Sequence, residues 1–226
     1  MIPYKSLEEV QKYREDGIKK IINCCSPALG IVYKNGILLA AQNPSFSFKK
    51  IIEVHERLAI VGVGEFNYFK KMADTAINMA DMQGFNYSPR DINVKSIVLG
   101  LAENLNQCFM NLDAVPLIVN LLIAEVDYHC KKTIYSLSYN GGIIDVFDFI
   151  AIGGKEEIIR SFLKTQYNPG IDLKSALNMA IKAIASTLEK NQEAITEFAI
   201  IDHTLTVTNK FKILTGAEVE KTIKEE

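Results

Sequence analysis

The stretch PALGIVYKNGILLAAQNPSFSFKKIIEVHERLAIVGVGEF, residues 27–66, decides the fold of this chain. Two apolar runs flank Asn35 and Gly36, a pair that tolerates the positive φ angles of a two-residue hairpin turn. Strand-like apolar runs follow at residues 51–54 and 58–63. Because such short connections join antiparallel neighbours, the stretch predicts a succession of antiparallel strands.

Helical periodicity is found on both sides of this region. Residues 6–22 show an amphipathic pattern that opens with a capping box, in which Ser6 and Glu9 would satisfy each other's backbone amides. Residues 66–84 and 89–112 repeat apolar side chains at the spacing of a helix. We therefore expect one helix before the first strands and a pair of long helices after them.

Local signals set the expected ends of the helices. We expect Gly84 to end the first helix of the pair, and Ser88 followed by Pro89 to begin the second. A further helix is expected after the glycine pair 153–154. Another is expected after Asp172, which is a good N-cap residue.

The remaining apolar runs complete the predicted architecture. Further strands are predicted at residues 116–126, 132–139, 143–152, 196–202 and 211–215. The runs ILLAA, LIVNLLIAEV and FDFIAI are almost continuously apolar, which requires cover on both faces of the strands. Hairpin connections combined with two covered faces imply a second sheet on one face and helices on the other. We therefore predict an α+β protein, a four-layer αββα sandwich in which residues 1–226 form a single domain.

The composition argues against several classes of function. The net charge of −2 disfavours nucleic acid as a main partner, because phosphate binding requires a concentrated positive field. No run reaches the roughly 18 apolar residues of a membrane span, and the N-terminus lacks the pattern of a secretory signal. Neither the four cysteines nor the three histidines show disulfide or metal-ligand spacing. We therefore expect a cytoplasmic protein with reduced thiols and without a metal or cofactor.

Three collinear segments resemble one known family. They are GIKKIINCCSPALGIVYKNGILLAAQNPSFSFKKIIEVHERLAIVGVGEFNYF (residues 17–69), DMQGFNYSPRDI (81–92) and YNGGIIDVFDFIAIGG (139–154). Together they are similar to proteasome α subunits of the bacterial type, which form the outer rings of the core particle. The resemblance implies the N-terminal nucleophile hydrolase fold and a heptameric ring that gates substrate access. The implied partners are other copies of the chain, proteasome β subunits and the C-terminal tails of an activating ATPase ring.

The resemblance also implies functional residues. Lys50 would bind the terminal carboxylate of an ATPase tail between neighbouring subunits. Gly64, expected at the start of the next helix, would let the tail approach bare backbone. Pro3 and Tyr4, within the first five residues, would form the gate, while the N-terminal helix would pack on neighbouring subunits and the long helix pair on the β ring. The plainer alternatives are a solvated lysine and a frayed chain end.

A catalytic role is not expected. In the β relatives the nucleophile is an N-terminal threonine freed from a propeptide, and the matching position here falls near Ser26, which follows a helix. Gln42 stands where those relatives carry an aspartate, so Lys50 lacks the carboxylate partner of a catalytic lysine. The alternative is a self-processing amidohydrolase of the same fold, matured by cleavage before Cys24, Cys25 or Ser26.

Overall fold

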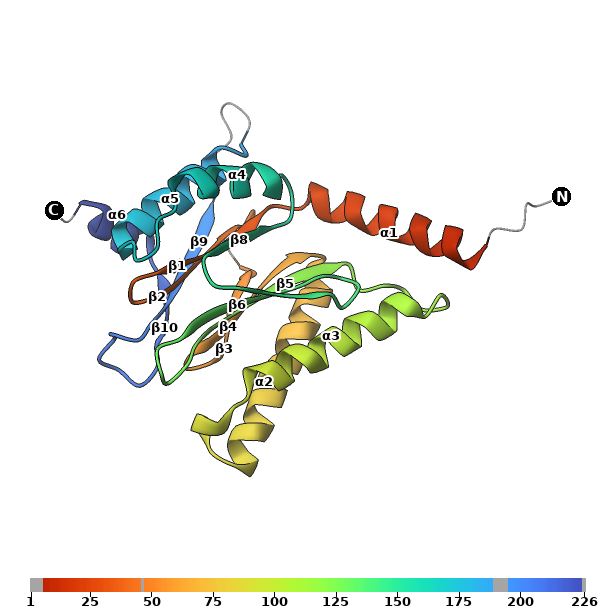
Figure 1. Ribbon diagram of the computed structural model, residues 1–226, viewed down its shortest axis with the longest axis horizontal. Coiled ribbons are helices and arrows are strands. Elements are labelled where there is room, and N and C mark those ends of the chain that lie inside the picture. The colour runs from red at the N-terminus through yellow and green to blue at the C-terminus, as the bar shows by residue number, and fades with distance from the viewer. Residues whose placement is uncertain (1–5, 46, 189–194, 225–226) are drawn as a thin grey trace.

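The computed structural model describes residues 6–45, 47–188 and 195–224. Within these residues, two five-stranded antiparallel sheets lie face to face, and helices cover the outer face of each (Figure 1). The predicted four-layer αββα sandwich is confirmed. In spatial order, the first sheet consists of β10 (Phe211–Leu214), β9 (Thr196–Asp202), β2 (Gly36–Gln42), β1 (Ala28–Tyr33) and β8 (Phe149–Ile152). The second consists of β3 (Ile51–His55), β4 (Leu58–Gly64), β5 (Val119–Val126), β6 (Lys132–Leu137) and β7 (Ile143–Val146).

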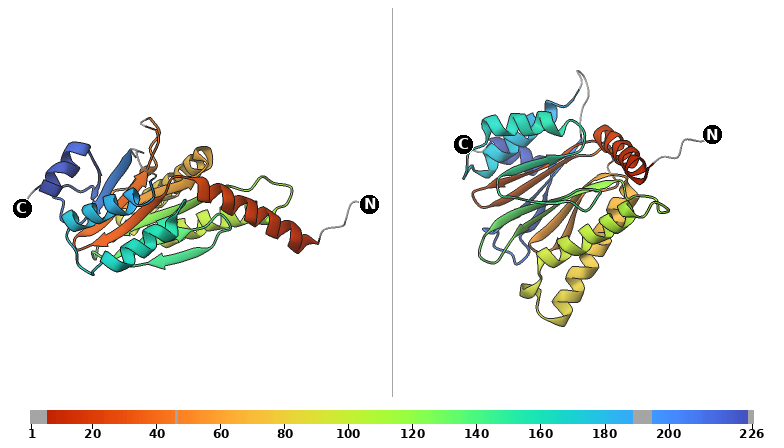
Figure 2. Two further views of the ribbon diagram at one scale, coloured as in Figure 1. Left: turned by 90° about the horizontal axis from the view of Figure 1, so that it is seen from above. Right: turned by 45° about the vertical axis from the view of Figure 1, so that its right-hand side comes forward.

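The helices form two outer layers and one projecting arm. The first sheet is covered by α4 (Glu156–Gln166), α5 (Leu173–Ala185) and α6 (Gly216–Lys224). The second is covered by α2 (Phe66–Asn86) and α3 (Val94–Met110), which the short 3-10 helix η1 (Pro89–Asp91) connects. The arm is α1 (Leu7–Cys24), which leaves one end of the sandwich and extends beyond it (Figures 1 and 2).

Strand β1 shows why its sequence is apolar without alternation. Its residues are all buried, because the two faces of the strand meet different layers. Leu29 and Ile31 pack among the residues of α5, whereas Ala28 and Val32 pack between the two sheets. Complete burial of a leucine or isoleucine contributes roughly 1.5–3 kcal/mol. The two-sided cover inferred from the apolar runs therefore supplies much of the stability of the sandwich.

The β1–β2 hairpin is present, but the reason given for its glycine was wrong. Neither Asn35 nor Gly36 has a positive φ angle. Gly36 is instead the first residue of β2, and a Cβ atom there would lie 1.9 Å from the main-chain oxygen of Ile201. Glycine is required at this position because β9 approaches the backbone closely, and not because the turn is left-handed.

The ends of the long helix pair also differ from expectation. Helix α2 continues through Gly84 to Asn86, and Ser88 caps η1 rather than α3. The side-chain oxygen of Asn93 is the acceptor that caps α3. A glycine inside a helix costs only about 1 kcal/mol. That cost is offset here because the Gln83 side chain bonds both Ser96 Oγ and the Asn93 amide, which ties the last turn of α2 to the start of α3.

The apolar run 143–152 is two strands rather than the one predicted. Strand β7 lies at the edge of the second sheet and β8 at the edge of the first, so the chain crosses between the sheets at residues 147–148. All four residues of β7 are at least partly exposed to solvent. An apolar edge strand and a buried strand look alike in sequence, which is why the crossing was missed.

The predicted N-terminal helix is confirmed as α1, with the Ser6–Glu9 capping box in place. Ile18 and Ile22 bury the last turns of the helix against Tyr139. Pro3 and Tyr4, the predicted gate residues, lie outside the described residues. Among the described residues, no helix is both long and apolar enough to cross a membrane.

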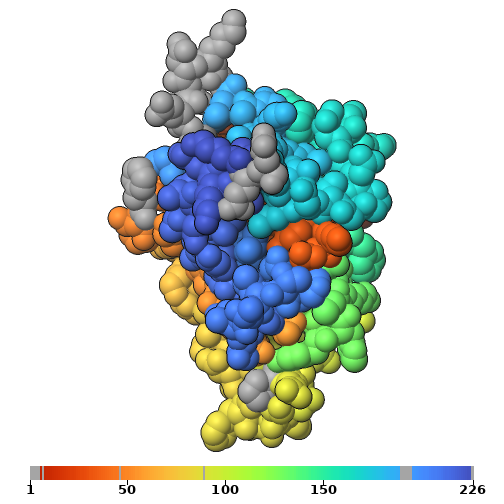
Figure 3. Space-filling model, turned by 90° about the vertical axis from the view of Figure 1, so that its left-hand side faces the viewer, coloured from red at the N-terminus to blue at the C-terminus, as the bar shows by residue number. Residues whose placement is uncertain are grey.

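The β1–β2 turn lies at the end of the molecule remote from α1 (Figure 1). Figure 3 looks onto this end, where α6 and the segment between β9 and β10 dominate the surface. The amide of His203 in that segment donates to the main-chain oxygen of Asn35, 3.1 Å away, in the β1–β2 turn. The site described next lies at the opposite ends of β1 and β2, beside the base of α1.

Candidate functional site

Lys50 is held at the end of the sandwich from which α1 departs. It ends the loop that connects β2 in the first sheet to β3 in the second. Its ammonium Nζ donates to the main-chain oxygens of Gln42, at 3.0 Å, and of Ser26, at 3.4 Å. Burial lowers the pKa of the Lys50 ammonium, while Cys25 and Glu197 nearby oppose that change. Lys50 is therefore not the freely solvated lysine of the plainer alternative.

Glu197 on β9 is the acid of this site, and sequence reasoning missed it. Its side chain is only 9% exposed. One carboxylate oxygen accepts from the backbone amides of Lys50, at 3.0 Å, and Ile51, at 3.4 Å. The other accepts from Asn43 Nδ2 at 2.6 Å, and the Lys49 ammonium lies 3.6 Å away. The available signal was a carboxylate next to the apolar run FAII in the predicted strand 196–202, where a buried charge requires partners.

Asn43 organises the same loop from its first residue. It is 2% exposed. Its side-chain nitrogen also donates to the main-chain oxygen of Phe48 at 2.5 Å, and its side-chain oxygen accepts from the Ser45 amide at 3.0 Å. This is the local pattern that asparagine adopts in turns. The hydrogen bonds of Asn43 thus hold the start of the loop that leads the chain to Lys50.

Gly64 lies near Lys50 but not where the sequence placed it. It ends β4, and α2 begins two residues later at Phe66, so Gly64 does not begin the helix. The residue opposite Lys50 is Gly62, two residues before Gly64 on β4, and its amide donates to the Lys50 oxygen at 3.3 Å. Gly64 has a φ angle of +135°, and a Cβ atom there would lie 2.1 Å from the main-chain oxygen of Ile118. The fold alone therefore requires glycine at this position.

The region of the expected nucleophile position lies between α1 and β1. Cys25 caps α1, and its main-chain oxygen accepts from the Gly154 amide at 2.9 Å. Cys24 is exposed and Cys25 is half-buried. Burial raises the pKa of the Cys25 thiol, although Lys50 opposes this, and the thiol donates to the Ile21 oxygen. A thiol with a raised pKa contains little of the reactive thiolate at neutral pH.

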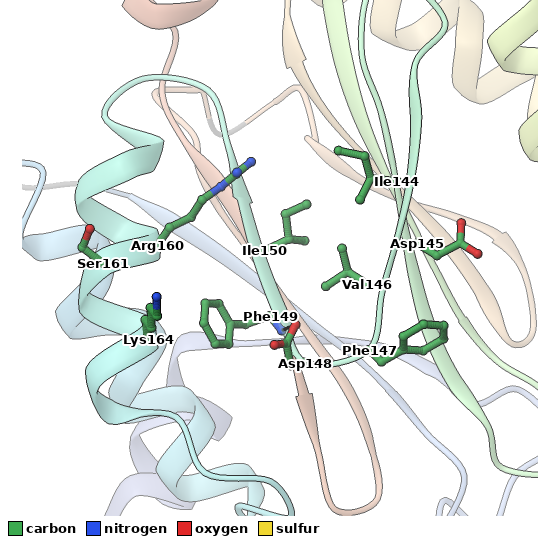
Figure 4. A pocket seen from close by; sticks show the side chains of 10 residues that line it. All are labelled: Ile144, Asp145, Val146, Phe147, Asp148, Phe149, Ile150, Arg160, Ser161 and Lys164. Atoms are coloured by element: carbon green, nitrogen blue, oxygen red, sulfur yellow. Dashed lines mark hydrogen bonds between the residues drawn. The ribbon is translucent and has the colours of Figure 1, made fainter.

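A separate hollow of 560 Å³ lies at the edge of the sandwich, between β7, β8 and α4. Figure 4 shows Ile144, Val146 and Ile150 around it, with Arg160 reaching from α4 toward β8. The guanidinium of Arg160 donates twice to the main-chain oxygen of Ala151, so its role is to hold α4 on the sheet. The lining is mainly apolar, which is typical of a contact surface rather than of a catalytic site.

Two antiparallel sheets between helix layers, with a lysine directed at the start of β1, place the chain in the class of N-terminal nucleophile hydrolase folds. A family model described as "Proteasome subunit" matches residues 23–201. The chain therefore belongs to the proteasome subunit family.

The chain is similar to curated proteins named proteasome subunit alpha. It is 33% identical to the one from Mycobacteroides abscessus, over 80% of this chain and 70% of the relative. It is 30% identical to the one from Frankia casuarinae, over 96% of this chain and 94% of the relative. It is 29% identical to the one from a Nocardioides species, over 98% and 89%. The resemblance to α subunits found in the sequence is confirmed.

Proposed function

We propose that this chain is a non-catalytic α subunit that forms a heptameric outer ring of a proteasome core particle. In that role it docks on rings of β subunits and restricts access to the axial pore. The observation that carries the proposal is that α1 leads directly into Ser26 as a folded element, with Ile18 and Ile22 in the core. Cleavage before Ser26 would remove these two buried side chains. Removal of a propeptide, in contrast, takes no side chain from the folded core.

The runner-up function is a self-processing amidohydrolase that exposes Cys24, Cys25 or Ser26. In the uncleaved chain, burial raises the pKa of the Cys25 thiol, so this thiol is not activated as a nucleophile before any processing. Gln42, which stands where the catalytic relatives hold an aspartate, supplies only an amide. Intact-mass measurement of the chain made together with its β subunit tests this reading directly. Loss of the first 23–25 residues would favour the hydrolase, and retention of α1 is the expected result.

Exposed apolar side chains support the contacts with other subunits. Tyr13 on α1 is 63% exposed on a helix that extends beyond the sandwich. We propose that this helix packs on neighbouring copies. At the tip of the α2–α3 pair, Phe85 is 90% exposed and Tyr87 78% exposed. Large apolar side chains gathered at such a site mark an interaction surface, and we assign this one to the β ring.

Lys50 is the proposed docking charge for the C-terminal carboxylate of an activating ATPase. An ammonium has three N–H donors, and the two acceptors of Lys50 Nζ are neutral carbonyl oxygens. A carboxylate is a stronger acceptor, so a tail that reaches this partly buried charge would form a charge-assisted hydrogen bond. Gly64 is retained in the proposal as a neighbour of Lys50 on the adjacent strand.

Pro3 and Tyr4 remain the proposed gate residues, on the sequence alone. A short segment before a ring-face helix could close a pore by packing with its symmetry mates. Deleting residues 2–5 should accelerate peptide hydrolysis by the assembled particle. An unchanged rate in the deletion variant would contradict the gate.

The experiment that tests the main proposal is co-expression with the β subunit of the same organism, followed by size-exclusion chromatography and particle imaging. The expected result is a stacked particle in which this chain forms the seven-membered end rings. A lone monomer that cleaves amide substrates without a partner would overturn the proposal.

A further inference from the structure

The loop that carries Lys50 is fixed by a carboxylate from a distant part of the chain. The loop connects β2 in the first sheet to β3 in the second, so its path depends on how the two sheets are joined at this rim. Glu197 belongs to the first sheet, where it pairs with Ala41 of β2. Its carboxylate accepts from the Lys50 and Ile51 amides at the start of β3. One side chain therefore joins both sheets at the residue proposed to dock the tail.

The requirements of the core do not explain an acid at position 197. Side chains alternate along a strand, and Ala199 and Ile201 on the same face of β9 pack between the sheets. Glu197 continues this row to the rim of the apolar layer. Burying a carboxylate there is unfavourable unless hydrogen bonds compensate, and an apolar residue would avoid that cost. Within the described part of the chain, the donors to Glu197 all belong to the loop or to the first residue after it.

The same contacts distinguish two adjacent lysines. The Lys49 ammonium lies 3.6 Å from the Glu197 carboxylate, so the charge of Lys49 already has an acidic partner. Glu197 accepts from the backbone of Lys50 and not from its ammonium, which is directed at Gln42 and Ser26. Among the described residues, the hydrogen-bond partners of the Lys50 ammonium are therefore neutral oxygens, while Glu197 bonds the backbone from which that side chain extends.

We propose that Glu197, together with Asn43, is a positioning residue that selects Lys50 as the docking charge and fixes the direction of its ammonium. This inference rests on the proposed function of Lys50, and it adds the residues that hold that lysine. Asn43 contributes because its side chain bonds both Glu197 and the Phe48 oxygen, which closes the loop on itself.

The test is competitive acylation of the full-length chain with acetic anhydride, read at each lysine by mass spectrometry. The rate at Lys50 is expressed relative to the exposed Lys71 on α2. In Glu197→Gln the relative rate at Lys50 should rise about tenfold, because the loop loses its charge-assisted bonds and the ammonium leaves its carbonyl partners. A rate within twofold of the wild type would overturn the proposal.

A matched control is available on β3. Glu53 accepts a hydrogen bond from a turn of the first sheet, from Asn209 Nδ2 at 2.6 Å, and no hydrogen bond joins its side chain to the described residues of the loop. Glu53→Gln should leave the Lys50 rate unchanged, and an equal rise there would contradict a specific role for Glu197. If Glu197→Gln fails to fold, Asn43→Ala decides, with a smaller rise at Lys50 expected and no rise overturning the proposal.

A second readout separates this inference from the function on which it rests. ATPase-stimulated degradation by the assembled particle should fall in both Lys50→Ala and Glu197→Gln. If Lys50→Ala leaves the stimulation intact, the docking function is wrong, while the acylation rates still report on the positioning of Lys50. If Lys50→Ala abolishes stimulation but Glu197→Gln changes neither stimulation nor acylation, the docking function stands and the positioning role is wrong.

Discussion

The Lys50 ammonium lies 3.0 Å from the main-chain oxygen of Gln42 and donates a hydrogen bond to it. In the catalytic relatives that the sequence resembles, an aspartate stands at the position of Gln42. The Gln42 side chain supplies no carboxylate, and the hydrogen-bond acceptors of the Lys50 ammonium among the described residues are neutral main-chain oxygens. A site of this kind favours an incoming anion over internal acid–base chemistry.

The first prediction concerns Lys50→Ala. Loss of a charge-assisted hydrogen bond of about 1.5–3 kcal/mol should weaken tail binding roughly 10- to 150-fold and abolish ATPase-stimulated degradation. Ring assembly should be intact, because the Lys50 ammonium bonds only neutral main-chain oxygens among the described residues, to which water can donate once the side chain is removed. Degradation assays with and without ATPase, together with sizing of the particle, provide the measurement.

Lys49→Ala is the matched control for that variant. Lys49 is adjacent in sequence, but its ammonium is already close to Glu197. Stimulation should therefore be retained in the Lys49 variant. Equal loss of stimulation in both variants would mean that the general positive charge of the loop, rather than Lys50, attracts the tail.

The second prediction concerns the anchoring of α1 by Arg14. Its guanidinium donates to the main-chain oxygens of Cys108, Asn111 and Ala114, at 2.9, 3.0 and 2.7 Å. Arg14→Ala removes three hydrogen bonds that join α1 to the end of α3 and the segment after it, although the Asn111 oxygen still accepts from the Ala114 amide. We therefore expect α1 to lose about 1–3 kcal/mol of local stability. Hydrogen exchange over residues 7–24 should accelerate, and the exposed Lys12→Ala variant serves as control. Unchanged exchange in the Arg14 variant would show that the buried end of the helix alone holds it.

The layers of the fold could be predicted because apolar periodicity reports burial directly. Leu29, Ile31 and their neighbours alternate between two covered faces, and only a four-layer arrangement satisfies them. The crossing at residues 147–148 could not be predicted, because Ile143 and Ile144 are apolar although they are exposed at a sheet edge. Periodicity cannot separate an apolar surface from an apolar core when both are extended.

Only those residues of the candidate site that lie close to Lys50 in the sequence could be predicted. Lys50 could be singled out because the resemblance to proteasome α subunits covers the loop and the strands on either side of it. Glu197 could not, because it is 147 residues away and no local pattern connects it to the loop. The pairing of β9 with β2 brings them together, and this pairing is a property of the sheet order rather than of either segment.

The third prediction contrasts two glycines. At Gly64 a Cβ atom would meet the Ile118 oxygen at 2.1 Å, with φ at +135°, so Gly64→Ala should destabilise the chain by at least about 2 kcal/mol. Nothing lies within 4 Å of the Cβ position at Gly17 in α1. Gly17→Ala should therefore stabilise the chain by about 0.5–1 kcal/mol through helix propensity. Urea unfolding measures both, and a tolerated Gly64→Ala would contradict the close approach of the Ile118 segment.

The last prediction is a pH dependence that arises from Glu125 on β5. Burial raises the pKa of Glu125 from its ordinary 4.5 to about 7, with a contribution from Asp127, while Lys131 and Lys95 oppose the change. The folded state then binds this proton more tightly than the unfolded state. Stability from this group is full below about pH 4.5, falls as the pH rises to about 7, and is lost above that value.

Glu125→Gln should remove this dependence. The shift would correspond to about 3 kcal/mol for a fully buried group, and partial exposure reduces it to about 1–2 kcal/mol. The variant should therefore be more stable than the wild type by about 1–2 kcal/mol at pH 8, and the difference should shrink toward pH 5. Urea unfolding at several pH values measures this, with the exposed Glu103→Gln as control. Parallel stability curves for wild type and Glu125→Gln would mean that Glu125 remains ionised in the folded state.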